Sequence, residues 1–180
     1  MKAFPIFLLF FLLACNSSPV NMQGFTNRKE AENLMVDGVK DGKWVEYGFL
    51  FWIIRFDTLD YTLIEYKHGS PVGIVREYYM DGKLKGEVQY DKVGKRIGVA
   101  RGFYKNGVMN AENNFMNNQY NGTAKAWYSN GVLDSEATYI NGEENGIVRH
   151  YHPNGKLESE VTWKDGKKIS EKDYPENDYH

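Results

Sequence analysis

Gly122-Thr-Ala-Lys-Ala-Trp-Tyr128 opens a pattern that occurs four times between residues 73 and 170. The same opening recurs at Gly73, Gly98 and Gly146, so successive copies lie 25, 24 and 24 residues apart. Each opening leads into a turn pair and then into a second apolar stretch that holds a Glu and ends in an aromatic residue. Because self-similarity at a fixed period of this length indicates a repeat array, each unit is predicted to be one hairpin.

Within a unit, apolar and aromatic residues recur at offsets counted from the first Gly as position zero. Position +2 is Val or Ala, positions +5 and +17 are aromatic and position +11 is Leu or Met. Period-two spacing of this kind predicts strands. The turn pairs predict tight two-residue turns, in which both residues supply positive φ angles. These pairs are Asp81-Gly82, Asn106-Gly107, Asn130-Gly131 and Asn154-Gly155. Gly at position zero is expected to leave room for a large neighbouring ring.

A charge pattern tests the pairing of the two strands in a unit. Position +3 is basic and position +14 is Glu in every unit, and with a two-residue turn the positions of opposed residues sum to 17. The predicted ion pairs are Arg76–Glu87, Arg101–Glu112, Lys125–Glu136 and Arg149–Glu160. An exposed pair contributes only about 0.2–1 kcal/mol, so this ladder selects a register more than it stabilises the fold.

The last unit departs from this pattern at Pro153, which has no amide to donate. Pro153-Asn154-Gly155 favours a three-residue turn with a bulge. A one-residue slip there would place Arg149 and Glu160 on opposite faces.

The predicted fold is all-β: a single-layer, elongated, twisted antiparallel sheet of successive hairpin repeats. Four units fill residues 73–170, and residues 37–72 are predicted to be a degenerate first repeat with an insertion or cap, because Gly42-Lys-Trp-Val-Glu-Tyr47 is similar to the unit opening. The apolar stretch Phe49 to Phe56 is interpreted as a buried strand or an end cap. Residues 28–36 fit either two turns of helix or a ragged strand, and residues 171–180 are predicted to be a frayed tail.

The first residues carry a separate signal. Residues 1–14 have a positive start at Lys2, an almost wholly apolar run and a small residue before Cys15. This is typical of a secretion signal, and its apolar run is shorter than the roughly 20 residues of a membrane span. The pattern resembles a bacterial lipoprotein signal, which implies that Cys15 is lipidated. An ordinary signal peptide with an incidental cysteine is the alternative. Residues 15–36 would then be the lipidated Cys and a tether, with a short helix as one option.

Composition and motifs argue against several classes of function. The formal net charge of −2 favours neither nucleic acid nor an anionic surface as a partner. The sequence lacks the common nucleotide-binding, hydrolase and redox motifs, so no enzyme, catalytic residue or cofactor is predicted. The strongest metal candidates are His150 and His152, which are expected to share a strand face, with Glu158 and Glu160 on the partner strand. The two His are better interpreted as drift within repeat columns, and no metal is predicted.

Aromatic residues are the remaining candidates for binding. They make up 15% of the chain and fall into stripes on both faces of the predicted sheet. One interpretation is that one stripe forms the core while the other packs between units. The alternative is a flat aromatic track for a protein partner, an extended peptide or a glycan. The predicted binding residues are Tyr79, Tyr104, Tyr128 and Trp127.

The recurring aromatic, Asn-Gly, Leu, Glu, aromatic and Gly pattern resembles the bacterial variant of the MORN repeat. The best matching segments are residues 127–146 and 151–166. The resemblance implies an array of hairpins that acts as an adaptor, a membrane-associated scaffold or the antitoxin of a toxin-antitoxin pair, and it implies no catalytic residues.

Together these features predict a non-enzymatic scaffold lipoprotein in the bacterial cell envelope with an unidentified protein partner. It would be membrane-anchored, periplasmic or surface-exposed, with the outer membrane favoured over the inner by analogy with sorting rules, because Asn16 follows the cysteine. An antitoxin or immunity-type protein that neutralises a toxin is the first alternative, and a glycan- or peptide-binding envelope module is the second. The oligomeric state is left open.

Overall fold

The computed structural model describes residues 25–48 and 60–175 of the 180-residue chain. Within these residues the chain forms a 13-stranded sheet, one short 3-10 helix and no α-helix. The helix η1 spans Arg28–Glu30. The strands are β1 (Leu34–Val36), β2 (Val39–Tyr47), β3 (Tyr61–Lys67), β4 (Ser70–Tyr78), β5 (Leu84–Tyr90), β6 (Arg96–Phe103), β7 (Met109–Met116), β8 (Gln119–Trp127), β9 (Leu133–Ile140), β10 (Glu143–Glu144), β11 (Gly146–Tyr151), β12 (Leu157–Lys164) and β13 (Lys167–Asp173).

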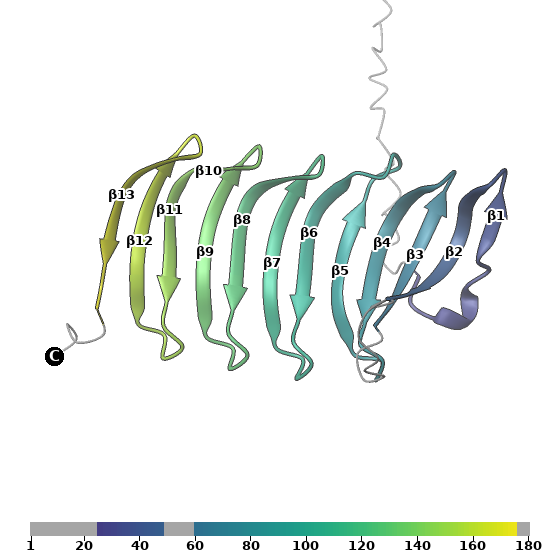
Figure 1. Ribbon diagram of the computed structural model, residues 1–180, viewed down its shortest axis with the longest axis horizontal. Coiled ribbons are helices and arrows are strands. Elements are labelled where there is room, and N and C mark those ends of the chain that lie inside the picture. The colour runs from purple at the N-terminus through teal and green to yellow at the C-terminus, as the bar shows by residue number, and fades with distance from the viewer. Residues whose placement is uncertain (1–24, 49–59, 176–180) are drawn as a thin grey trace, which may run out of the picture.

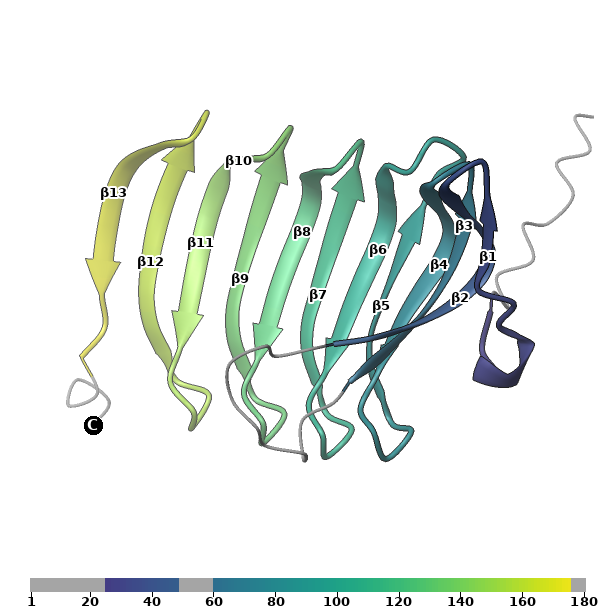
Figure 2. The same cartoon turned by 45° about the vertical axis from the view of Figure 1, so that its right-hand side comes forward.

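The strands form one open antiparallel sheet in chain order. Each strand pairs with the next, except that the two-residue β10 pairs only with β9, and β11 takes the following place in the sheet. Figure 1 shows this arrangement as a single elongated layer, and Figure 2 shows how the strands near β2 are inclined to those near β13. The predicted fold class is therefore confirmed.

The predicted register is confirmed in all four units. Arg76 is directly opposite Glu87 in the pair β4–β5, and the equivalent residues face one another in β6–β7, β8–β9 and β11–β12. The last unit follows the same rule, so Arg149 and Glu160 lie on one face despite Pro153.

The prediction of two-residue turns is wrong at Asp81-Gly82, Asn106-Gly107 and Asn130-Gly131, whereas the three-residue turn with a bulge at Pro153-Asn154-Gly155 is confirmed. In β6–β7 the Tyr104 amide donates to the Val108 carbonyl and the Gly107 amide donates to the Tyr104 carbonyl, so three residues form the loop, and the same two bonds occur in the other three units. Such a loop alone would shift the pairing by one residue. A bulge between positions +4 and +5 restores it, and for this reason the charged residues still meet.

Two-residue turns lie at the opposite edge of the sheet, between units. Both residues of these turns have positive φ angles, which is the geometry of a type I′ turn. The turns are Asp37-Gly38, His68-Gly69, Asn117-Asn118, Asn141-Gly142 and Asp165-Gly166. The connection from β5 to β6 is longer and has the three-residue form at residues 92–94.

The first Gly of each unit serves the backbone and not a neighbouring ring. Gly73, Gly98, Gly122 and Gly146 have φ between 67° and 111°, where side chains with a Cβ are strained. A Cβ added at Gly73 or Gly146 would meet no atom within 4 Å, so the expected close approach of a ring is wrong. Gly73, Gly98 and Gly122 lie beside an irregularity in the pairing of their unit with the one before it, and Gly146 follows the break between β10 and β11.

The N-terminal end of the sheet carries a small core. Phe25 and Leu63 are almost fully buried and pack with Tyr61, Val45 and Tyr78. In the pair β2–β3, the apolar Val45 and Leu63 face each other at the place where later units have an ion pair. Because no charge lies there, Phe25 can pack on this end of the sheet and cover it.

Two predicted boundaries change. Residues 28–36 contain both a single 3-10 turn and the strand β1, so neither of the two interpretations was complete. β13 continues to Asp173, and the Tyr174 hydroxyl donates to Glu160, so residues 171–174 do not belong to a frayed tail. The signal segment 1–14, Cys15 and the apolar stretch from Phe49 to Phe56 lie outside the described residues.

Candidate functional site

A groove runs across the strands on one face of the sheet. Two adjoining hollows of about 440 and 340 Å³ form it, the first from β3 to β7 and the second from β7 to β11. Ala111 and Asn113 of β7 line both hollows, so the two are continuous.

Small side chains make up the floor of this groove. Eight residues of β6–β9 lie directly opposite one another across the four strands. They are Ala100, Gly102, Ala111, Asn113, Ala124, Ala126, Ser135 and Ala137. In the outer units four of the equivalent places hold the larger Val75, Val88, Val148 and Val161. The middle of the array is therefore hollow because its repeat columns lose volume there.

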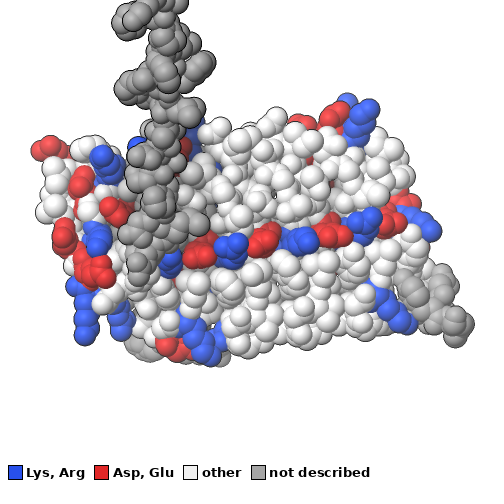
Figure 3. All heavy atoms as spheres, turned by 180° about the vertical axis from the view of Figure 1, so that it is seen from behind, with Lys and Arg blue, Asp and Glu red and all other residues white. Residues whose placement is uncertain are grey.

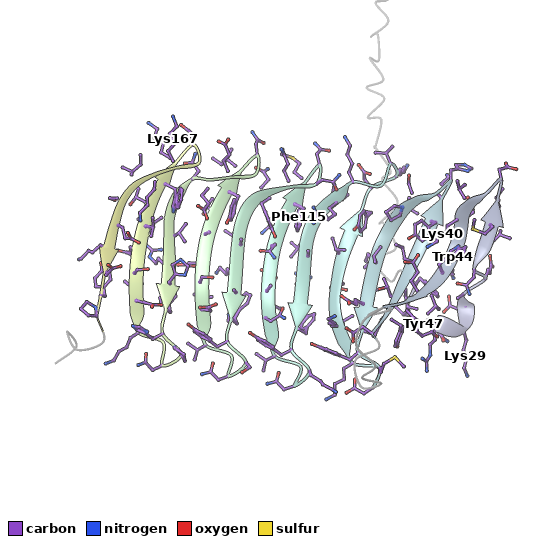
Figure 4. The ribbon with its side chains drawn as sticks, viewed as in Figure 1. Lys29, Lys40, Trp44, Tyr47, Phe115 and Lys167 are labelled. Atoms are coloured by element: carbon purple, nitrogen blue, oxygen red, sulfur yellow. The ribbon has the colours of Figure 1, made fainter. Side chains whose placement is uncertain are left out.

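Aromatic rings form one rim of the groove: Phe115 and Tyr139 from position +17, and Tyr120, which pairs with Phe115. Phe115 lies near the end of β7 (Figure 4), and its centroid is 4.6 Å from that of Tyr120, which in turn is 5.2 Å from that of Tyr139. The guanidinium carbon of Arg96 lies 4.5 Å from the Phe115 centroid. Burial, together with a hydrogen bond to Glu144, raises the pKa of Tyr139 to about 12, so the ring is neutral at physiological pH.

Tyrosines from position +6 lie at the opposite end of the strands. Tyr79 lines the first hollow. The Tyr79 hydroxyl donates to the Phe103 carbonyl at 2.8 Å, that of Tyr104 to Trp127 at 2.8 Å and that of Tyr128 to Tyr151 at 2.7 Å. Each predicted binding tyrosine thus joins its unit to the next one. Its role in binding a partner stays a prediction.

Trp127 is separated from those tyrosines by the alternation of the strand. It follows Ala126 of the floor and pairs with Leu133, so it lies on the other face of the sheet. Tyr78 and Tyr151 occupy the same position in their units and face the same way, since Tyr78 packs with Phe25 and Leu63 and the Tyr151 hydroxyl donates to Glu136. Of the four predicted binding aromatics, Trp127 therefore lies on a different face from Tyr79.

Polar groups of the groove differ in how they are satisfied. The Lys85 ammonium bonds to Glu77 at 2.8 Å and to Asp60 at 2.5 Å. A Cβ on Gly102 would lie 2.3 Å from the side-chain oxygen of Asn110, so the Asn110 amide lies over this glycine. Within residues 25–48 and 60–175, the side chains of Asn110 and Asn113 have no hydrogen-bonding partner and line the first hollow.

The opposite face carries the predicted ion-pair ladder, which is longer than predicted. Charged residues of neighbouring units also lie directly opposite each other. These pairs are Glu87–Arg101, Glu112–Lys125 and Glu136–Arg149. Figure 3 shows the resulting row of alternating charges. Arg101 lies 3.0 Å from Glu112 and 3.6 Å from Glu87, and Arg149 lies 2.8 Å from Glu160 and 3.1 Å from Glu136. Arg101 and Arg149 at position +3 therefore each bridge two units.

The ladder also determines where Glu160 lies. Glu160 accepts hydrogen bonds from Arg149 and Tyr174, which lower the pKa of its carboxyl. It faces away from His150, which pairs with Ser159 on the groove face, so Glu160 and His150 do not lie on one face. Across the described part of the chain, no group of three or more His, Cys, Asp and Glu residues is arranged to hold a metal ion.

Comparison with known families supports a MORN-repeat protein. Residues 71–92, 120–141 and 144–165 match the model of the MORN repeat variant. Each matched segment contains the Gly that opens a unit, namely Gly73, Gly122 or Gly146, together with most of the hairpin that follows it. Residues 98–115 lie between two matches and form the hairpin β6–β7 with the same register. A comparison with curated proteins found no match. Among the described residues, no helix is long and apolar enough to cross a bilayer.

The groove floor is the feature that the sequence analysis missed. Its signal is present in the columns, because positions +2 and +15 change from Val to Ala or Asn in the two middle units and return to Val. A pattern based on large apolar residues detects strands but does not show where a face loses volume.

Proposed function

We propose that the protein is a non-enzymatic scaffold lipoprotein of the bacterial cell envelope, and that the groove over β6–β9 binds another protein. The groove carries this proposal. It combines an apolar floor of small residues with a rim of rings, and surfaces of this kind are commonly used for recognition. MORN repeats are often binding modules, which supports the same interpretation.

A binding role without catalysis fits the state of the charged groups around the groove. Lys85 is neutralised by Asp60 and Glu77, and Glu144 accepts a hydrogen bond from Tyr139. Catalytic acids, bases and nucleophiles usually lie where a polar group is exposed to a substrate and its pKa suits proton transfer. The groups here are held by structural contacts, so the groove is better suited to contact than to reaction.

The proposed anchor is a lipid on Cys15. The support comes from residues 1–15 alone, whose order of charge, apolar run and small residue before a single cysteine is typical of a lipoprotein signal. Residues 16–23 would then connect the lipid to the sheet. In this arrangement the scaffold is held at the membrane, with the outer membrane favoured, and the partner is recruited there.

The groove is tested by filling it. Ala137→Trp introduces a large ring into the floor, whereas Thr138→Trp introduces the same ring on the adjacent residue, which is exposed and points to the opposite face. Both variants and the wild type are crosslinked and pulled down from native membranes. We expect Ala137→Trp to lose at least tenfold of the recovered partner and Thr138→Trp to retain it. Equal recovery by both variants, each with a wild-type circular dichroism spectrum, would overturn the proposed role of the groove.

The anchor is tested separately. Cys15→Ala removes the acceptor thiol, and we expect most of the protein to move from the membrane pellet to the soluble fraction. Cys15→Ser is the matched control for a polar residue of the same size and should behave in the same way. Unchanged sedimentation with the membrane would show that another feature holds the protein there.

A further inference from the structure

We propose that the groove binds a proline-rich segment of the partner in the polyproline II conformation, lying across the strands. This inference rests on the proposed function and specifies the chemistry of the partner. Its elements are the spacing of the groove, its aromatic rim, its free amide groups and its charge.

The spacing of the units favours this conformation over others. Neighbouring strands lie about 4.8 Å apart, so equivalent residues of successive hairpins recur about every 9.6 Å along the groove. A polyproline II helix rises about 3.1 Å per residue with three residues per turn, and it presents the same side about every 9.3 Å. An extended strand repeats about every 6.7 Å and an α-helix about every 5.4 Å. Only the polyproline II period keeps step with one hairpin.

The length of the groove suits a short segment. The two hollows extend from Val75 on β4 to Val148 on β11, which spans seven neighbouring strands. Six strand intervals of about 4.8 Å give roughly 29 Å. At about 3.1 Å per residue, this distance accommodates about nine residues of a polyproline II helix.

The side chains of the groove match such a segment. Proline rings pack against aromatic side chains in grooves of this kind. Tyr120, which is 39% exposed, and the half-buried Tyr139 offer such rings, and the buried Phe115 packs behind Tyr120. Proline has no amide to donate, and a polyproline II backbone forms no internal hydrogen bonds, so its carbonyls need donors from the partner. The side-chain amides of Asn110 and Asn113 can donate and, within the described part of the chain, have no other partner.

The floor of the groove carries no charge and therefore suits an uncharged segment. All eight floor residues from Ala100 to Ala137 are uncharged. Of the cations that line the first hollow, Lys85 is held between two carboxylates, Arg101 pairs with Glu87 and Glu112, and the Arg96 guanidinium lies over the Phe115 ring at the rim. The charged ladder lies on the opposite face. A charged peptide side chain would lose hydration over this floor without finding an opposite charge there, whereas the side chains of Pro and Ala carry no charge to desolvate.

The probe is a fluorescent peptide of four Pro-Pro-Ala repeats, titrated against the lipid-free chain that begins after Cys15 and followed by fluorescence anisotropy. The control peptide replaces each Pro by Gly, which removes the preformed helix and keeps the backbone uncharged. We expect the Pro peptide to bind at least tenfold more tightly than the Gly peptide. Ala137→Trp should weaken binding by at least tenfold, and Thr138→Trp by less than twofold. Asn113→Ala should weaken it severalfold while leaving the unfolding midpoint within a few degrees.

Several results would overturn the inference. These are absence of binding by the Pro peptide, equal binding of both peptides, or binding that Ala137→Trp does not affect. Preferential binding of a β-linked oligosaccharide in the same assay would assign the groove to a glycan instead. If the partner pull-down depends on Ala137 but the Pro peptide does not bind, the proposed function stands and the polyproline inference fails. If the pull-down is independent of Ala137, the proposed function itself fails.

Discussion

Gly107 ends the loop between β6 and β7 with a φ of 87°, and Asn106 before it has a different task. The Asn106 backbone is not in the positive-φ region. Its side-chain oxygen accepts from the Val108 amide, and its amide donates to the Ser129 carbonyl of the next loop. Asn130 does the same toward Val132 and Pro153. The Asn-Gly pair therefore divides the work: glycine permits the loop conformation, and asparagine joins neighbouring loops.

The first prediction concerns the conformation of Gly107. A Cβ added there meets no atom within 4 Å, so substitution tests the φ angle without steric overlap. Gly107→Ala should lower the free energy of unfolding by about 1 kcal/mol, because Ala is strained at positive φ. Gly107→Asn is the matched control and should cost less, since Asn tolerates this region. Urea denaturation measures both. Equal costs for Ala and Asn would show that the φ angle is not the limiting factor.

The second prediction concerns pH. The folded-state pKa of Glu160 is lowered, first by the Arg149 hydrogen bond and then by that of Tyr174. Its contribution to stability is therefore present above the unfolded pKa of about 4.3 and is lost as the pH falls through the lower folded value. Glu160→Gln should be less stable than the wild type at neutral pH and show a smaller loss of stability on acidification. Unfolding midpoints measured from neutral to acid pH test this.

Glu158→Gln is the control for that experiment. Glu158 is the bulge residue of the same strand and lies on the groove side, as the equivalent Lys85 and Asn110 do. Within residues 25–48 and 60–175 its side chain forms no ion pair or hydrogen bond. Its substitution should leave the acid limb of the stability curve close to that of the wild type. Identical pH profiles for Glu160→Gln and the wild type would contradict the assigned role of Glu160.

Hairpins are joined to one another by contacts at three heights along the strands. Loop asparagines act at one edge, hydroxyls of the +6 tyrosines act just inside it, and the ladder acts at mid-strand. In the first unit Asp81 replaces the loop asparagine, but a side chain still donates to a carbonyl of the next loop. Asp81 has no amide to donate, and the Lys83 ammonium instead reaches the Lys105 carbonyl at 3.1 Å. Because these contacts connect only adjacent units, the stability of the array is expected to depend on nearest neighbours.

The third prediction tests one of these contacts. Tyr104→Phe removes only the hydroxyl that donates to the Trp127 carbonyl, and we expect the free energy of unfolding to fall by about 1 kcal/mol. Tyr120→Phe is the control, because the Tyr120 hydroxyl has no partner within the described residues and the side chain is 39% exposed. Thermal unfolding of both variants is the measurement. If Tyr104→Phe is as stable as the wild type, the hydrogen bond to Trp127 does not stabilise the array, and binding would be the only role left for Tyr104.

Repetition explains which elements could be predicted from the sequence. The alternation of side chains and the basic and Glu positions recur in all four units, so the chance of coincidence is small. For this reason the strands and their register were predicted correctly. The loop type was not predictable from Asn-Gly alone, because this pair suits both a two-residue turn and a three-residue loop with a bulge. The prediction missed both the third loop residue and the bulge at Lys85. These two features offset each other, so the predicted pairing of Arg76 with Glu87 was still correct. The groove was missed because a hollow is marked by small residues such as Ala126, which give no strong periodic signal.

The whole molecule is a sheet with two different faces. One face has the ladder beside a row of large apolar side chains, such as Tyr78 and Leu84. The other has small residues in the middle units and valines toward the ends. A single-layer sheet cannot bury both faces, and the face that lacks volume is the one available to a partner. The number of units then sets the length of the groove.

The fourth prediction follows from this modular construction. Deletion of residues 102–125 joins Arg101 to Ala126, removes one period and places Arg101 opposite Glu136, so strand alternation and the ladder are retained. The shortened chain should fold to the same β-sheet by circular dichroism. At about 0.05–0.15 kcal/mol per residue, its free energy of unfolding should be roughly 1–4 kcal/mol smaller. It also loses Gly102, Ala111 and Asn113 from the floor, and partner recovery in the pull-down should fall strongly.

The control deletion is one residue shorter. Removing residues 102–124 joins Arg101 to Lys125, so two basic residues become neighbours and every following side chain in that strand moves to the other face. Arg101 would then point to one face and Lys125 to the other, and Ala126 would leave the groove side. We expect this chain to lose cooperative unfolding although it keeps one more native residue. Equal stability of the two deletions would mean that the register is not set by the alternation of the faces, and the assignment of groove and ladder to opposite sides would have to be abandoned.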